Sequence, residues 1–458
     1  MEISSTKRRT PDKPQTLNPE PHLTDVLCRL LPVAFCALLV AGSLQCARQA
    51  VNPSSGPVRV FVTDARLDRF PAYAAEVRAR QAISPTIWLV TGDLFADQQL
   101  TALTDGAAQL TLLNRAGVDA VVLTPDWLSF GLPRLGQMVS QARFYELSAS
   151  LLDATGSTLG HPFMVRKNGS ANLALTGLAL DSSNVLTRMA GVRYAAPDFA
   201  ARKALALMRQ RAYFVGVMVE PNGRGSRVQG FKGSGPRTPE PQPPRTLSAW
   251  DADFTVNFGA SEQFSMAPAD SPNQVNSYDV SVDAGRVSAR TSVLDPLKPD
   301  STVALVLDSV QKAVDSVSSL PFPLSSSRGG PWTSARLSDA LVKGAFAAKL
   351  ADGFLCDSLF VADFKEPKDV GTLVSLLRDP GRLAILAVTG EVLSGWPEEL
   401  VLRPGLSRAA LSRGLTYRIA TTVEYLQRHP QLAATGFELS ARPLWTIGRD
   451  ILESGQVK

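Results

Sequence analysis

The sequence predicts an α/β protein with two parts. From residue 57 onward, short apolar runs rich in β-branched residues alternate with amphipathic stretches, which is typical of a mainly parallel sheet covered by helices. The same alternation returns in a shorter C-terminal part, after a segment rich in Pro, Ser and Gly. We therefore expect a larger domain over residues 57–297, a linker helix and boundary over 298–331, and a smaller α/β domain over 332–458.

The larger domain is expected to hold buried strands, because its apolar runs are short, continuous and rich in β-branched residues. These strands are predicted at 58–63, 86–91, 119–124, 172–180 and 213–220. Residues 97–116 predict one amphipathic helix that ends at Gly117, a residue type that often follows a helix C-terminus. Period-two alternation over residues 277–294 predicts a β-hairpin that closes the domain.

A long basic segment interrupts this pattern. Residues 222–247 are dense in Gly, Pro and Arg and show no periodicity, so they predict a surface loop. Its cations could contact an anionic partner, although a solvated insertion also explains them.

The C-terminal part follows a linker helix expected over 301–317 and a Pro/Ser/Gly boundary over 321–331. Helices are expected where apolar residues recur with helical spacing, and strands where β-branched runs are continuous. The expected elements are a helix at 334–350, a strand at 358–364, a helix at 369–377, and strands at 382–388 and 416–426.

The composition of the 458 residues excludes several classes of protein. Apolar residues make up 45% and charged residues 19%, which argues against wholesale disorder, a collagen-like fibre or a polytopic membrane protein. A net charge of +5 is spread too thinly over this length to indicate a nucleic-acid partner. The three histidines, at positions 22, 161 and 429, limit any histidine-rich metal site to those residues.

The N-terminus has the pattern of an export signal. A polar leader over residues 1–25 precedes a segment at 26–47 whose uncharged stretch, Leu30 to Leu44, is short for a membrane-spanning helix. Cys46 follows this stretch as in a bacterial lipoprotein signal, so lipidation, ordinary cleavage and a retained membrane anchor all remain open, beside a buried core helix. Only Cys356 lies outside this segment, and no disulfide is therefore expected within the exported chain.

Several stretches match one known family in the same order along the chain. Residues 88–132 combine a strand ending in Gly-Asp, a Leu-rich helix, a Gly-x-Asp-Ala turn and another strand. The similarity continues through 144–179, 277–296, 373–396 and 414–426. Together these stretches resemble the exported 5′-nucleotidase branch of the calcineurin-like metallophosphoesterases. The resemblance implies a metallophosphoesterase sandwich domain followed by a smaller α/β 5′-nucleotidase C-terminal domain.

The resemblance also implies a two-metal site at the ends of the strands, from which this sequence departs. Asp64 keeps the carboxylate of the family's Asp-x-His motif, but Arg66 stands at the histidine position, and a permanent cation cannot bind a metal ion. Asp93 keeps the carboxylate of the Gly-Asp motif. Asp126 replaces the catalytic histidine of Gly-Asn-His-Glu, and Glu220 aligns near a lone histidine.

The remaining candidate metal ligands are therefore Asp64 and Asp93, with Asp126 and Glu220 as oxygen replacements. The family's His-x-His motif aligns near residues 259–261, which are Gly, Ala and Ser. A structural explanation is also open, since carboxylates at strand ends often cap the next helix or pair with a nearby cation such as that of Arg66. A site of oxygen ligands alone would favour Mg²⁺, Mn²⁺ or Ca²⁺.

The nucleotide-binding motifs of the C-terminal domain are altered as well. Residues 363–367 stand where the family has Asn-Gly-Gly-x-Arg, and residues 379–382 lack the phenylalanine of Pro-Phe-x-Asn that helps to stack the base. Phe364 could stack on a ligand, but a single aromatic residue beside a strand is more often part of the core.

From these departures we expect an exported envelope protein that has lost two-metal catalysis and serves as a binding or assembly protein, without a cofactor. The alternative is a divergent hydrolase of nucleotides or other phosphate esters that uses an oxygen-only metal site. A receptor that binds a small molecule between its two domains is a third hypothesis. The expected partners are an envelope protein or a small-molecule ligand and, through the N-terminal segment, a membrane, but no nucleic acid.

Overall fold

A computed structural model describes most of the chain from residue 57 onward. The described residues are 57–168, 171–180, 184–220, 252–256, 265–266, 269, 274–281, 286–295, 298–321, 333–356, 359–360, 367–377, 379–396, 400–434 and 436–453. Asn52–Lys458 form one compact unit. The predicted export segment with Cys46, the basic loop at 222–247 and most of the predicted strand at 358–364 lie outside the described residues.

The first sheet has six strands in the order β13-β12-β1-β2-β3-β4. Strands β1 to β4 run parallel, while β12 pairs antiparallel with β1 and β13 antiparallel with β12. The bounds are Val58–Asp64 (β1), Thr86–Thr91 (β2), Ala120–Val122 (β3), Tyr145–Leu147 (β4), Gln274–Ser281 (β12) and Arg286–Val293 (β13). The predicted hairpin is confirmed as β12 and β13.

The second sheet has the order β11-β10-β9-β7-β6, and only β6 runs antiparallel to its neighbour. Its strands are Met164–Asn168 (β6), Ala171–Ala179 (β7), Phe214–Glu220 (β9), Phe254–Val256 (β10) and Ser265–Met266 (β11). Gly177 lets the two sheets approach closely, because a Cβ atom there would lie 2.7 Å from the Cβ atom of Leu147. Leu151–Asp153 (β5) and Val192–Tyr194 (β8) form a separate two-stranded ribbon.

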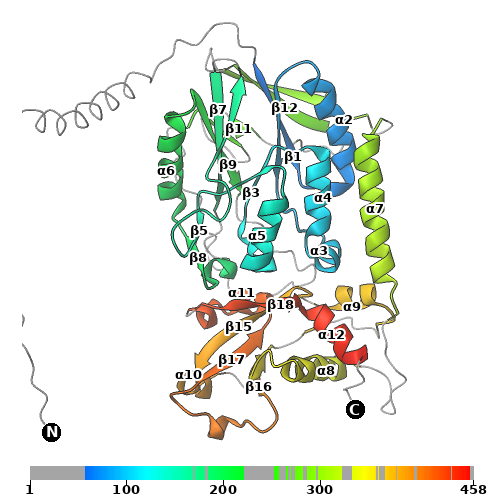
Figure 1. Ribbon diagram of the computed structural model, residues 1–458, viewed down its shortest axis with the longest axis vertical. Coiled ribbons are helices and arrows are strands. Elements are labelled where there is room, and N and C mark those ends of the chain that lie inside the picture. The colour runs from blue at the N-terminus through cyan, green and yellow to red at the C-terminus, as the bar shows by residue number, and fades with distance from the viewer. Residues whose placement is uncertain are drawn as a thin grey trace, which may run out of the picture. The chain divides into compact units, whose positions relative to one another are not determined.

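Helices cover both sides of this pair of sheets (Figure 1). Helix α6 packs on the second sheet, and α2, α4 and α7 lie together on the side of the first. Their bounds are Phe70–Gln81 (α2), Gln98–Thr104 (α3), Ala107–Ala116 (α4), Leu132–Gln141 (α5), Pro197–Arg209 (α6) and Ser301–Ser318 (α7). The predicted linker helix is thus α7, and it packs against α2, α3 and α4.

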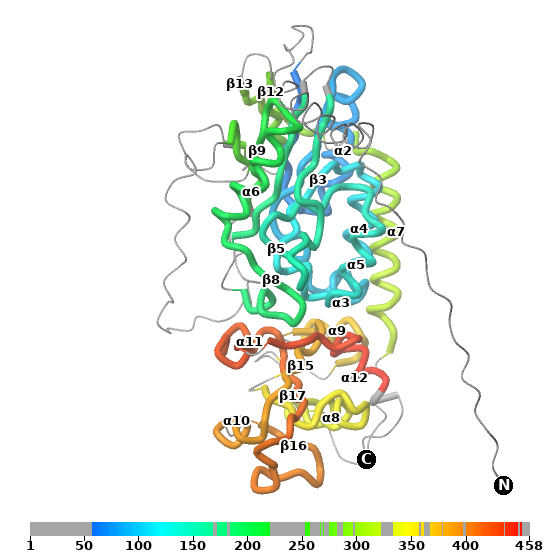
Figure 2. Tube along the Cα trace, turned by 60° about the vertical axis from the view of Figure 1, so that its left-hand side comes forward, coloured from blue at the N-terminus to red at the C-terminus, as the bar shows by residue number. Residues whose placement is uncertain are grey.

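The C-terminal part is built on a third, mixed sheet with the order β16-β14-β17-β15-β18. The strands are Gly353–Leu355 (β14), Arg382–Thr389 (β15), Leu400–Leu402 (β16), Thr416–Thr421 (β17) and Glu438–Pro443 (β18). The helices are Ser334–Ala347 (α8), Val370–Leu376 (α9), Gly390–Ser394 (α10), Val423–Arg428 (α11) and Leu444–Glu453 (α12). Figures 1 and 2 both show α9 and α11 at the junction with the larger part.

Two predicted elements differ from the structure. The helix expected over 97–116 is interrupted, because Asp105 and Gly106 both adopt the left-handed conformation and separate α3 from α4. The strand expected over 416–426 ends at Thr421, since the side chain of Thr422 accepts a hydrogen bond from the N–H of Tyr425 and caps α11.

Candidate functional site

A cavity of about 470 Å³ lies between the larger part and the C-terminal part. Its walls come from the turn after β2, α3, the segment after β3, the turn before β15, and α11. The described lining residues are Asp93, Phe95, Gln98, Thr101, Ala102, Asp105, Asp126, Ser129, Phe130, Asn184, Leu186, Asp379, Pro380, Gly381, Arg382, Val423, Glu424, Gln427, Arg428 and Pro443. Two of the four candidate metal ligands, Asp93 and Asp126, therefore face the same space.

Asp93 enters the cavity from the end of a buried strand. All six residues of β2 are buried, and Gly92 then adopts a φ of 96°, which a residue with a side chain rarely does. One carboxylate oxygen of Asp93 accepts a hydrogen bond of 2.9 Å from the N–H of Phe95, which closes a tight turn. The carboxylate has solvent access within the cavity, but the surrounding protein is dense enough that burial raises the pKa of Asp93.

Asp126 lies in the first turn of a 3-10 helix, Pro125–Phe130, that follows β3. The side-chain amide of Asn184 lies 3.5 Å from a carboxylate oxygen of Asp126. The carbonyl oxygen of the same amide accepts from the N–H of Leu186 and so caps the short helix Val185–Arg188. Asn184 thus connects Asp126 to the neighbouring helix Val185–Arg188, whose Leu186 also lines the cavity.

Asp64 is not among the described residues that line this cavity. Its carboxylate accepts a hydrogen bond of 2.9 Å from the hydroxyl of Tyr73 and one of 3.3 Å from the backbone N–H of Arg66. Burial, followed by the negative charge of Asp64, raises the pKa of Tyr73 to about 12, so the phenol keeps its proton and remains a donor to this carboxylate. The guanidinium of Arg66 pairs with Asp68 at 3.3 Å on the exposed surface.

Glu220 ends β9, where its backbone is paired with Ala179 of β7, and its side chain is outside what the structure describes. The ring of His161 lies 3.3 Å from the carboxylate of Glu146, and that of His429 packs against Tyr425. Within the described ranges, no three or more His, Cys, Asp or Glu side chains form a group that could hold a metal ion.

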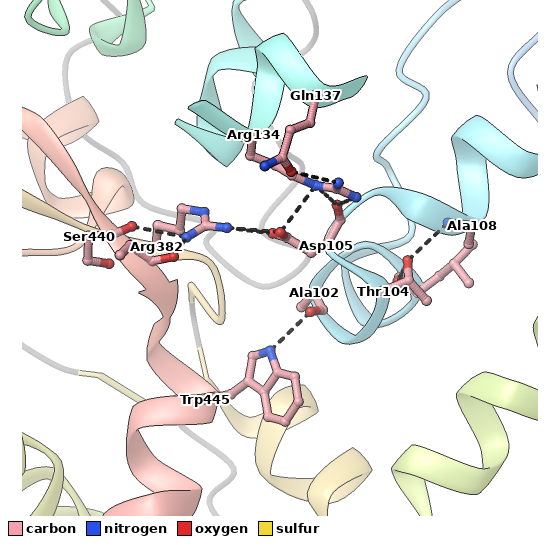
Figure 3. Close-up of polar contacts among 11 residues, drawn as sticks. Ala102, Thr104, Asp105, Ala108, Arg134, Gln137, Arg382, Ser440 and Trp445 are labelled. Atoms are coloured by element: carbon pink, nitrogen blue, oxygen red, sulfur yellow. Dashed lines mark hydrogen bonds and ion pairs between the residues drawn. The ribbon is translucent and has the colours of Figure 1, made fainter. Parts of the chain in front are cut away.

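The C-terminal wall of the cavity is fixed by a carboxylate between two guanidinium groups (Figure 3). Arg382 of β15 donates two hydrogen bonds, of 2.9 and 3.1 Å, to the carboxylate of Asp105. Arg134 of α5 lies 3.3 Å from the same carboxylate and also donates to the backbone carbonyl of Asp105. The left-handed conformation of Asp105, with a φ of 49°, places its side chain at the break between α3 and α4.

Asp379 supports the wall beside Arg382. Its carboxylate accepts hydrogen bonds from the N–H groups of Val423 and Glu424, at the start of α11, and from that of Gly381. An acidic side chain at a helix N-terminus stabilises the helix by satisfying its first N–H groups. Burial nevertheless raises the pKa of Asp379. The helix that it caps presents Glu424 and Arg428 to the cavity, with 3.8 Å between their charged groups.

Asp93 and Asp126 lie at strand ends, as the sequence predicts, whereas the helical pattern over 97–116 does not indicate that Asp105 is part of this wall. The Asp-Gly pair at 105–106 is a turn signal inside a helical pattern, and that signal could have revealed the break. A single sequence gives no comparable signal for Arg382, because Asp105, the carboxylate to which it donates, lies 277 positions away along the chain.

No protein-family model matches the sequence, and no curated protein matches it either. Among solved structures, a Staphylococcus aureus protein described as a 5′-nucleotidase, in complex with α-ketoglutarate, is similar with a TM-score of 0.50 and 13% identity. The match covers 86% of this chain and 96% of that one. The fold is that of a 5′-nucleotidase.

Two further structures show lower similarity to this 5′-nucleotidase fold. A 5′-nucleotidase precursor from Thermus thermophilus has a TM-score of 0.48 and 12% identity, with 87% of this chain and 96% of that chain covered. The sulfate thiohydrolase SoxB of Thermus thermophilus has a TM-score of 0.45 and 16% identity, with coverages of 84% and 80%. The 5′-nucleotidase fold expected from the sequence is confirmed, and a fold alone does not determine an activity.

Proposed function

We propose that this protein binds a small molecule in the cavity between its two parts and does not use the two-metal hydrolysis that the sequence resemblance implies. One observation carries the proposal: Asp93 and Asp126 line a cavity of about 470 Å³, whereas Asp64 does not belong to its described lining and accepts a hydrogen bond from the hydroxyl of Tyr73. The cavity volume is within the usual range for small-molecule sites, roughly 300 to 1,000 Å³.

The geometry around Asp64 supports this proposal. A two-metal phosphoesterase needs carboxylates that reach both cations, which lie roughly 4 Å apart. The hydroxyl of Tyr73 and the backbone N–H of Arg66 both donate to the same oxygen of the Asp64 carboxylate, so that oxygen is engaged by the protein itself. The sequence also has Arg66, Pro125 and Asp126 where the resemblance implies metal-binding or catalytic residues. No cofactor is part of the proposal.

A second function, hydrolysis of nucleotides or other phosphate esters, is favoured by the presence of Asp93 and Asp126 in one cavity. Carboxylate oxygens are suitable ligands for Mg²⁺, Mn²⁺ or Ca²⁺, and Glu220 at the end of β9 would be a further ligand in such an enzyme.

Metal analysis and activity assays separate the two functions. We expect purified protein to contain less than stoichiometric metal, and to show no turnover with a panel of nucleotides and phosphate esters in Mg²⁺, Mn²⁺ or Ca²⁺. Stoichiometric metal together with turnover that Asp93→Asn abolishes would reject the binding function. Asp339→Asn is the matched control, because Asp339 forms an exposed pair with Lys343 on α8.

We also propose that the protein is exported and held at the cell envelope by its N-terminal segment, through Cys46 or a retained anchor, where it meets an envelope partner or a small ligand. Within the described residues, no helix is long and apolar enough to cross a bilayer. Mass spectrometry of the mature N-terminus tests the proposal: lipid on Cys46 or an intact leader in the membrane fraction supports anchoring, and a full-length chain in the cytosol rejects export.

A further inference from the structure

We propose that the outer face of α6 is a membrane-contact surface, which lies against a bilayer that contains anionic lipid. Exposed apolar side chains and exposed cations on this face support the proposal. The inference goes beyond the ligand-binding function and does not depend on what the cavity holds.

Helix α6 is amphipathic and covers the second sheet. Its buried residues are Ala200, Ala201, Ala204, Leu205 and Met208. They pack in one apolar cluster with Val215 and Val217 of β9. Figure 1 shows α6 at the outer edge of the larger part. The face opposite the buried residues, which we call the outer face, therefore points away from the sheet.

The outer face and the end of α6 expose large apolar side chains. Phe199, in the first turn, is 65% exposed, and Leu207, in the last turn but one, is 42% exposed. Tyr213 is 55% exposed, and it lies beside the end of the helix because Arg209 donates to its backbone carbonyl. Removal of such side chains from water is favourable, so a surface that buries them would be stabilised.

Cations lie between these apolar side chains. Arg202 and Lys203 are exposed, and they follow Phe199 at a spacing that places all three on one side of the helix. Within the described part of the chain, neither Arg202 nor Lys203 has an ion-pair partner. The guanidinium of Arg211 lies 5.5 Å from the centroid of the Phe163 ring and adds a positive charge just after the helix.

Acidic side chains do not cancel this charge. Asp198 is the acid of α6, while Arg209 pairs with Asp253 at 2.7 Å. Arg202, Lys203 and the nearby Arg211 therefore leave an excess of positive charge. Cations beside aromatic and aliphatic side chains are typical of helices that lie on anionic membranes, where the cations meet lipid phosphates and the apolar side chains enter the acyl boundary.

A bilayer fits this face better than a folded partner does. The outer face is convex, and a protein that bound it would need a groove of matching shape, whereas a fluid bilayer adapts to the helix. The chain from Cys46 to Val58 spans at most about 40 Å, so the anchor proposed above would keep the larger part near a membrane. This last support rests on the proposed anchoring, but the observations on α6 do not.

Quenching of tryptophan by brominated phosphatidylcholine tests the inference, because bromine in the acyl chains quenches a tryptophan that touches the bilayer. The full chain is reconstituted with vesicles of phosphatidylglycerol and brominated phosphatidylcholine. We expect Phe199→Trp to increase the quenching above that of the wild type. Val392→Trp is the control and should not, since Val392 is 53% exposed but lies on α10 in the C-terminal part. Leu207→Trp is a second variant, should Phe199→Trp fail to fold.

The charge of the outer face is tested in the Phe199→Trp variant. Arg202→Glu combined with Lys203→Glu should remove most of the additional quenching, because each basic residue near an anionic surface contributes about fivefold to binding. Lys312→Glu combined with Lys343→Glu changes the net charge equally at exposed positions of α7 and α8, and should leave the quenching unchanged. Omitting phosphatidylglycerol or raising the salt concentration should also lower it.

Equal quenching of the Phe199→Trp and Val392→Trp variants would overturn the inference, and so would additional quenching that persists after the charge reversal on α6. A lipid-free dimer that Phe199→Asp disperses would overturn it as well, since the face would then belong to a second copy of the chain. None of these results bears on the ligand-binding function or on the anchoring, which metal analysis, activity assays and mass spectrometry of the N-terminus test separately.

Discussion

Glu146 is a carboxylic acid whose side chain is completely buried next to β3 and β7. One of its oxygens lies 3.3 Å from Nδ1 of His161, and the other has no hydrogen-bond partner among the described atoms. Burial raises the pKa of Glu146 from 4.5 to about 7. A buried acid with one unsatisfied oxygen is destabilising when charged, since the protein interior solvates the charge poorly.

This gives a pH-dependence prediction for Glu146→Gln. Because the folded-state pKa is raised, the stabilising contribution of the neutral acid is fully present below pH 4.5 and is lost as the pH rises through about 7. The loss is on the order of 3 kcal/mol. We therefore expect the variant to unfold at a higher temperature than the wild type at pH 8 and at nearly the same temperature at pH 4. Calorimetry at the two pH values measures this, and an equal effect of the substitution at both would contradict it.

At the scale of elements, the break between α3 and α4 positions the cavity wall. Asp105 and Gly106 both have positive φ, and the break turns the end of α3 toward the C-terminal part. Gly106 also lies against two side chains, because a Cβ atom there would approach both Met138 and Phe130 to 3.0 Å. A glycine is thus required at position 106 for its conformation and for the space around it.

We expect Gly106→Ala to destabilise the protein by about 1 to 3 kcal/mol, through left-handed strain and contact with Met138 and Phe130. Gly136 is the control, since it lies within α5 and a Cβ atom there would meet nothing within 4 Å. Gly136→Ala should stabilise the protein by up to about 1 kcal/mol through higher helix propensity. Chemical denaturation of both variants measures the difference, and equal effects would show that the break is not under steric constraint.

Sequence patterns predicted those helices and strands that are determined by the local order of apolar and polar residues. The strands at β1, β2, β7 and β9, the hairpin of β12 and β13, and α7 follow from apolar runs, period-two alternation and helical spacing, and the structure confirms them. The break at Asp105 was missed because helical periodicity continues on both sides of it. The end of β17 was missed because the apolar pattern continues into α11, and the cap at Thr422 decides the boundary.

The candidate site was predicted in part. Strand ends correctly indicated where Asp93 and Asp126 would lie, because parallel strands bring their C-terminal ends to one edge of a sheet. Pattern alone did not indicate that Tyr73 would hold Asp64, nor that Arg382 would reach Asp105, since both contacts depend on tertiary packing. The predictions about metal, cofactor and partner remain predictions.

At the scale of the whole molecule, the two parts are joined by polar contacts as well as apolar packing. The ring nitrogen of Trp445 donates to the carbonyl of Ala102 at 3.0 Å, and the backbone N–H of Val185 donates to the side chain of Gln427 at 2.7 Å. The bridge from Arg382 to Asp105 adds a charge pair, in which the Arg382 side chain is only 9% exposed. The cavity therefore lies between parts that are joined on more than one side.

We expect Arg382→Met to destabilise the protein by about 2 to 3 kcal/mol, because it removes two donors to the carboxylate of Asp105 and the donors to the carbonyls of Ser440 and Ala441. Lys343→Met is the control, since the exposed pair of Lys343 with Asp339 should contribute less than about 1 kcal/mol. Thermal unfolding followed by tryptophan fluorescence checks both variants. A destabilisation by Arg382→Met no larger than that of the control would show that the bridge does not hold the two parts together.

The break between α3 and α4, at residues 105–106, is also a place where insertions and deletions should not be tolerated. Inserting or deleting one residue there would disrupt the pair of left-handed residues that separates α3 from α4, and Asp105 would no longer be held where it accepts hydrogen bonds from Arg382. Surface loops usually accept such changes in length. We therefore expect that, in a library of single-residue insertions and deletions, the variants changed at this turn give little soluble protein.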